Sequence, residues 1–118
     1  MTSVNVTYVV QSAEAAIRFY CQRLGFKEVM FPLRSLAILE RGNLTLTLVT
    51  APPGQAKPGG WNRFRLEVAD VDAEIRRLGE QGVRFRGDAV TTTGGKYAIA
   101  EDPSGNPIEL FQLASPRT

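Results

Sequence analysis

The sequence predicts an α+β fold made of two βαβββ modules, because the 118-residue chain repeats itself. Residues 10–18 (VQSAEAAIR) resemble residues 68–76 (VADVDAEIR) at an offset of 58 residues, which is about half of the chain. Each copy shows a strand-like segment, a polar capping residue and an amphipathic helical pattern that ends at glycine. We therefore expect two curved mixed sheets, each with one helix on its outer face.

The first half of the chain is expected to form one helix and four strands. Residues 4–10 read as a strand, and Ser12 after them is a suitable N-cap for a helix. Gly25 ends this helix, because glycine readily adopts the left-handed conformation found there. Three further strands are predicted over residues 26–31, 36–40 and 44–49. The helix presents one apolar face, formed by Ala13, Ala16, Ile17, Tyr20 and Leu24.

The second half repeats this order. A strand is predicted over residues 64–68, followed by Asp70 as the helix N-cap, an apolar face of Val71, Ile75 and Leu78, and Gly82 at the helix end. Strands follow at residues 83–85, 97–101 and 107–113. Proline and glycine interrupt residues 51–61, which predicts a linker. We expect one domain over residues 1–118, with modules at 1–50 and 62–118.

Composition excludes several classes of partner. The formal charge is +2, and the 14 basic and 12 acidic residues are interspersed, so no footprint for nucleic acid is expected. No apolar run approaches the length of a membrane span, and the N-terminus lacks the features of a signal peptide. Cys21 is the single cysteine and is expected to be a packed structural thiol. We expect a cytoplasmic protein without a membrane partner.

Three segments carry a resemblance to a known family. They are residues 16–20 (AIRFY) with 24–26 (LGF), residues 68–72 (VADVD), and above all residues 101–110 (EDPSGNPIEL). Over nearly its whole length the chain resembles the glyoxalase, bleomycin-resistance protein and extradiol dioxygenase superfamily, also called the vicinal oxygen chelate fold. The resemblance implies two modules around a cleft that often holds a metal through histidine, with a final-strand glutamate such as Glu109 completing the site.

The metal-ligand positions implied by this resemblance fall on Asn5, Thr47, Arg63 and Glu109. The chain contains no histidine, and these residues offer one anionic ligand together with a permanent cation. We therefore expect neither a metal nor another cofactor. Our hypothesis is that Arg63 replaces the metal and forms an ion pair with Glu109. The alternative is that Arg63 turns out to solvent.

Strand alternation predicts further residues on the inner, cleft-facing side of the sheets. Ile108 and Leu110 should lie under the helix, which places Glu109 on the opposite face. Trp61 ends the linker and either stacks on an aromatic ligand or anchors the linker on the sheet. The other candidate ligand-binding residues on the inner side are Thr7, Arg65, Glu67 and Phe111.

Three functions are compatible with these residues. The first is a metal-independent protein that binds a small organic molecule without chemical change, similar to the drug-sequestering resistance proteins of the superfamily. The second is a metal-independent isomerase, lyase or ring-opening enzyme, with Glu109 as the catalytic base and Arg63 stabilising an oxyanion. The third is a metal-dependent glyoxalase-like lyase or dioxygenase, against which the lack of histidine argues. A homodimer is also expected, because exposed sheet edges favour pairing.

Overall fold

The computed structural model describes residues 4–33, 36–50 and 58–115. Most of the predicted linker, residues 51–57, lies outside the described residues. The chain forms two compact units: the first comprises Met1–Gly60 and Asp102–Asn106, and the second comprises Trp61–Glu101 and Pro107–Thr118. The turn at residues 102–106 thus groups with the first half of the chain, a division that the repeat in the sequence does not indicate.

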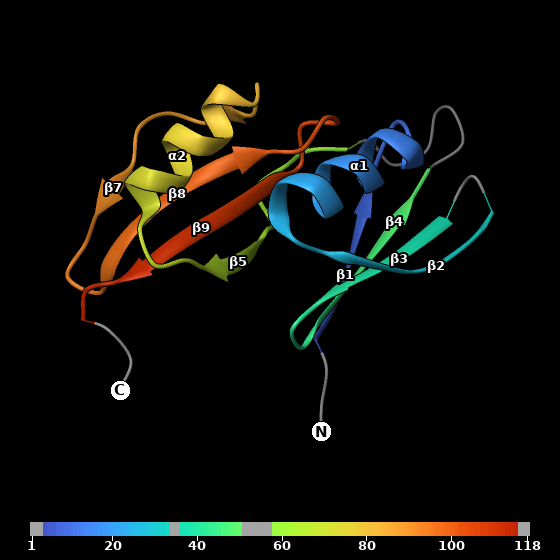
Figure 1. Cartoon of the computed structure of the whole chain (residues 1–118), viewed down its shortest axis with the longest axis horizontal. Helices are drawn as coiled ribbons and strands as arrows, with labels where there is room; N and C mark the ends of the chain where they lie inside the picture. Colours follow the sequence, from blue (N-terminus) through green and yellow to red (C-terminus); the bar gives the residue numbers. More distant parts are fainter. Residues whose placement is uncertain (1–3, 34–35, 51–57, 116–118) are drawn as a thin grey trace. The chain divides into compact units, whose positions relative to one another are not determined.

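The first unit contains a four-stranded mixed sheet with one helix across it (Figure 1). Its strands lie in the order β1-β4-β3-β2, with β1 parallel to β4 and the other neighbours antiparallel. The predicted fourth strand has the observed bounds. The first ends one residue earlier than expected, the second begins one residue later and ends two residues later, and the third ends one residue later. The elements are β1 (Val4–Val9), α1 (Ala13–Leu24), β2 (Lys27–Leu33), β3 (Leu36–Arg41) and β4 (Leu44–Val49).

The ends of α1 follow the predicted capping chemistry. The Ser12 side chain accepts a hydrogen bond from the backbone N–H of Ala15, and Gly25 adopts a φ of 74° at the C-cap. The apolar face differs in detail from the prediction, because Phe19 is buried and Ile17 only half-buried. Phe19 packs edge to face against Tyr20, with ring centroids 5.1 Å apart, so the buried face includes an aromatic pair that the predicted face lacked.

The second unit contains a five-stranded mixed sheet. Its order is β5-β9-β8-β6, with the short β7 also paired to β8, and α2 packs against β8 and β9 (Figure 1). β7 was not predicted; it has only two residues, and both are exposed, so it carries no alternating pattern. The elements are β5 (Phe64–Glu67), α2 (Val71–Glu80), β6 (Arg84–Phe85), β7 (Val90–Thr91), β8 (Gly95–Glu101) and β9 (Pro107–Leu113). The predicted α+β fold with two modules is confirmed.

The helix α2 also begins and ends as its sequence indicates. The carboxylate of Asp70 accepts a hydrogen bond from the backbone N–H of Ala73, and Gly82, with a φ of 84°, lies just beyond the C-cap. Val71 and Leu78 are buried, while Ile75 is half-buried. Among the described residues, no helix has the length and apolarity that crossing a membrane requires.

The turn at residues 102–106 is tied into the first unit by buried polar contacts. The hydroxyl of Tyr20 donates to Asp102 Oδ2 at 2.8 Å, and Asn106 Nδ2 donates to the backbone carbonyl of Val9 at 2.7 Å. Asn106 Oδ1 also accepts from the backbone N–H of Gly59 at 2.7 Å. Burial, and then the charge of Asp102, raise the pKa of Tyr20 well above its ordinary value. The sequence predicts this turn but not its partners.

Candidate functional site

The polar face of the second sheet brings together four of the predicted site residues. On β5, Phe64 and Leu66 are buried, so Arg65 and Glu67 point to the opposite face. β5 runs parallel to β9, with Arg65 opposite Glu109 and Glu67 opposite Phe111. Residues in register on adjacent strands share a face, so these four side chains lie together. Ile108 and Leu110 are buried on the helix side, as predicted.

The hypothesised pair between Arg63 and Glu109 is present. Arg63 Nε donates to Glu109 Oε1 at 3.0 Å, and Arg63 Nη2 lies 2.9 Å from the same oxygen. The Glu109 side chain is 6% exposed and that of Arg63 26% exposed, so the pair is largely withdrawn from water. Arg63 Nη1 also donates to the backbone carbonyl of Trp61 at 3.4 Å. The alternative, an Arg63 that turns out to solvent, is wrong.

Arg65 is a second partner of Glu109. Its Nε donates to Glu109 Oε2 at 2.6 Å, and its guanidinium carbon lies 4.2 Å from the centre of the Phe111 ring. Each oxygen of one carboxylate is therefore held by a different arginine, in what we call the Arg63–Glu109–Arg65 cluster. Sequence reasoning placed Arg65 on this face but missed the ion pair. This ion pair follows from the register of β5 against β9, which cannot be derived from the sequence alone.

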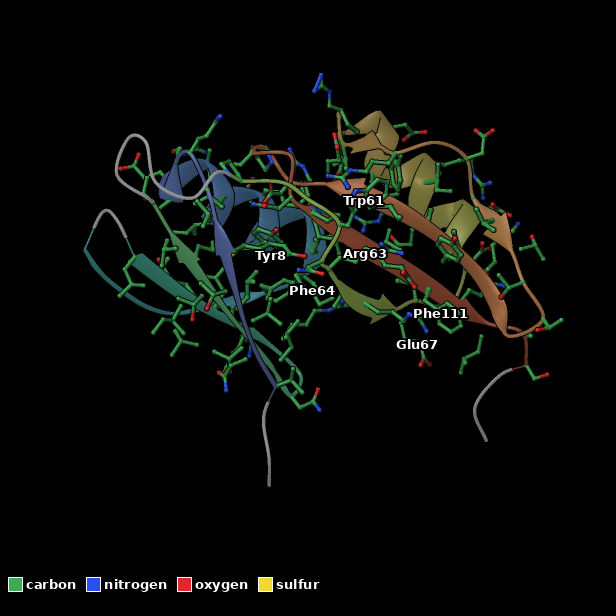
Figure 2. All side chains as sticks on the ribbon, turned by 180° about the vertical axis from the view of Figure 1, so that it is seen from behind. Tyr8, Trp61, Arg63, Phe64, Glu67 and Phe111 are labelled. Carbon is green, nitrogen blue, oxygen red and sulfur yellow. The ribbon has the colours of Figure 1, made fainter. Side chains whose placement is uncertain are left out.

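A second charged pair lies beside Trp61. The Trp61 side chain is 78% exposed, and the guanidinium carbon of Arg86 lies 6.0 Å from its ring centre. Arg86 Nε donates to Glu101 Oε2 at 2.8 Å. Sequence reasoning missed both Arg86 and Glu101, because they become neighbours only through the pairing of β6 with β8. Figure 2 shows Trp61 and Arg63 on the segment that leads into β5.

The remaining predicted residues lie in the first unit. Asn5 and Thr7 are exposed on β1, and Thr47 is half-buried on β4. Thr7 is directly opposite Thr47 in the parallel β1–β4 pair, so all three side chains share the face that lies away from the buried leucines of β4. The nine predicted site residues thus fall into two sets, three in the first unit and six in the second.

The donor set does not fit a transition-metal centre. Glu109 is the one anionic ligand of the four implied positions, and both of its oxygens already bind guanidinium groups. Arg63 cannot act as a ligand, and Asn5 and Thr47 offer only weak neutral oxygens. Within residues 4–33, 36–50 and 58–115, no group of three or more His, Cys, Asp or Glu side chains is placed to hold an ion. That the protein needs no metal or cofactor stays a prediction.

Comparisons with known proteins agree with this fold. The family model described as Glyoxalase/Bleomycin resistance protein/Dioxygenase superfamily matches residues 3–110. No curated protein matches the chain. Among solved structures, the chain is similar to TnmS3, an antibiotic binding protein from Streptomyces sp. CB03234, with 30% identity, 97% of each chain covered and a TM-score of 0.77.

Two further structures show how widely this fold is shared. A superfamily member from Sphaerobacter thermophilus is 25% identical, with 95% of this chain and 97% of that chain covered and a TM-score of 0.78. A lactoylglutathione lyase from Agrobacterium tumefaciens is 19% identical, with 92% and 91% covered and a TM-score of 0.74. The lyase, at that identity, shares the fold alone.

Proposed function

Because the chain belongs to the glyoxalase/bleomycin resistance protein/dioxygenase superfamily, we propose that it binds a small organic molecule without a catalytic metal and without chemical change. The observation that carries this proposal is the Arg63–Glu109–Arg65 cluster, in which two arginines hold the one carboxylate found among the four implied metal-ligand positions. The similarity to the antibiotic binding protein TnmS3 supports an antibiotic as the class of ligand.

The same cluster makes Glu109 a poor general base. A base must bring a carboxylate oxygen within hydrogen-bond reach of the proton that it removes. Here Oε1 accepts from Arg63 and Oε2 from Arg65, and the side chain is almost fully buried. We therefore rank binding above a metal-independent isomerase or lyase that would use Glu109 as its base.

The proposed contact residues are those with accessible side chains on the polar faces of the two sheets. In the second unit these are Trp61, Arg65, Glu67 and Phe111, and the Trp61 side chain is 78% exposed. In the first unit they are Asn5, Thr7 and Thr47. A mixture of aromatic, charged and hydroxyl side chains suits a small molecule with both apolar and polar groups. The expected homodimer also stays a proposal, consistent with β1 and β5 being edge strands.

Calorimetric titration tests the proposal directly. Chelator-treated protein is titrated with nickel, zinc, manganese and, anaerobically, ferrous ion, and then with a panel of aromatic antibiotics. We expect no stoichiometric metal binding, at least one antibiotic that binds, and recovery of that antibiotic with its mass unchanged. Tight binding of one ion that is lost in Glu109→Gln would contradict the proposal and restore the metal-enzyme interpretation. An antibiotic recovered with altered mass would favour the enzyme.

A further inference from the structure

The guanidinium group of Arg65 is fixed in place but only partly used. Its Nε is bound to Glu109, and its guanidinium carbon lies over the Phe111 ring, 4.2 Å from the ring centre. Its side chain is nevertheless 57% exposed, and among the described residues no partner accepts a hydrogen bond from its two terminal amino groups. Arg65 therefore presents a pre-oriented pair of donors to solvent.

The cluster around Arg65 has an excess of positive charge. Two guanidinium groups share the single carboxylate of Glu109. Arg63 is the more buried of the two, and its Nε, Nη1 and Nη2 all have partners within the protein. Glu67 lies on the same face, opposite Phe111 in the register of β5 and β9. The excess charge is therefore accessible at the terminal amino groups of Arg65.

We propose that Arg65 is an anion-binding group, and that the ligand of this face is an aromatic acid with a carboxylate, sulfonate or phosphate group. This inference rests on the proposed binding function and specifies the class of ligand. A planar guanidinium binds two oxygens of such a group at once, and its contacts with Glu109 and Phe111 reduce the entropy lost on binding.

The aromatic part of the ligand has its own surface nearby. Trp61 is 78% exposed and precedes Arg65 by four residues, so their Cα atoms lie at most about 14 Å apart. The guanidinium of Arg86 lies 6.0 Å from the centre of the Trp61 ring and is paired with Glu101, so this pair adds no net charge. Within that limit one molecule can place rings on Trp61 and an acid group on Arg65, whereas a cationic drug would meet Arg65 unfavourably.

Two fluorescent dyes test this inference, because they differ only in the acid group. Anilinonaphthalene sulfonate and phenylnaphthylamine share the same ring systems, and only the first carries a sulfonate. We expect the wild-type protein to bind the sulfonate dye about tenfold more tightly, since a charge-assisted bidentate contact is worth at least that factor. In Arg65→Met this ratio of Kd values should fall to about one, with the Kd of the neutral dye changed less than about twofold.

Two other variants keep the result interpretable. Arg76→Met removes the same charge from an exposed position on α2, on the other side of the sheet, and should leave the ratio unchanged. Glu67→Gln removes an anion from the face of Arg65 and should tighten binding of the sulfonate dye by about twofold, a gain that unfolding cannot produce.

The possible results distinguish a failure of the anion-binding role of Arg65 from a failure of the proposed binding function. Equal binding of both dyes by the wild-type protein, or a ratio that survives Arg65→Met, overturns the anion-binding role while the proposed binding function stands. If neither dye binds and no antibiotic binds either, the proposed function fails, and the anion-binding role fails with it.

Discussion

Replacing Glu109 by glutamine removes the charge that holds Arg63 and Arg65 together. The contacts with Arg63 involve a carboxylate that is 6% exposed, and hydrogen bonds of this kind to a charged group contribute about 1.5–3 kcal/mol. In the other contact the Arg65 side chain is 57% exposed, so this contact contributes about 0.2–1 kcal/mol. Glutamine retains one acceptor oxygen but turns its amide donors toward the other arginine. We therefore expect a loss of about 2–3 kcal/mol in the free energy of unfolding.

Urea denaturation of the wild-type protein and Glu109→Gln measures this loss. The matched control is Glu74→Gln, which removes one exposed ion pair with Arg77 on α2 and should cost no more than about 0.5 kcal/mol. Equal slopes of the unfolding transitions would show that the variants unfold from similar native states. If Glu109→Gln costs no more than Glu74→Gln, the cluster contributes no more than a surface pair, and the reasoning about its burial is refuted.

Two further predictions concern groups whose pKa is raised. Tyr20→Phe should cost about 1.5 kcal/mol near neutral pH, because Asp102 Oδ2 keeps only its bond from Asn106 Nδ2. Because the pKa of Tyr20 is raised in the folded protein, the tyrosine of the unfolded chain ionises first as the pH rises. The free energy of unfolding of the wild type should therefore fall above about pH 10, and its difference from that of Tyr20→Phe should narrow. A difference that stays constant from about pH 9 to 11 would contradict this. Burial, and then the charge of Glu28, raise the pKa of the Cys21 thiol. At about pH 8, iodoacetamide should therefore alkylate Cys21 several-fold more slowly in the folded protein than in the urea-unfolded chain. Equal alkylation rates would contradict a packed thiol.

The local elements could be predicted because each carries a signal within a few residues. Ser12, Asp70 and Gly25 set the helix ends by capping chemistry that depends on adjacent backbone groups alone. The alternation of leucine and threonine gave β4 with the observed bounds. β7 escaped prediction because a two-residue strand is defined by its partner, β8, rather than by its own pattern.

For the candidate site, the sequence predicted which face of a strand each side chain occupies, but not which side chains contact each other. Alternation placed Arg65 and Glu109 on one face, and the resemblance to the superfamily implied Arg63 and Glu109 as positions of one site. The bond between Arg65 and Glu109 depends on strand register, and the ion pair between Arg86 and Glu101 depends on the pairing of β6 with β8. Both are long-range facts that no local pattern encodes.

Because both carboxylate oxygens of Glu109 accept hydrogen bonds from arginines, this site differs from a metal centre at more than one residue. If Arg63 were the only obstacle, replacing that one residue by histidine would supply both a ligand and a free carboxylate. Arg65, however, would still hold Oε2 and keep a positive charge beside any incoming ion. Two changes are therefore needed before a cation could use Glu109, because replacing either arginine alone leaves the other paired with the carboxylate. The arrangement is thus self-consistent as a binding surface for an acid, with Arg63 holding the carboxylate and Arg65 facing the ligand.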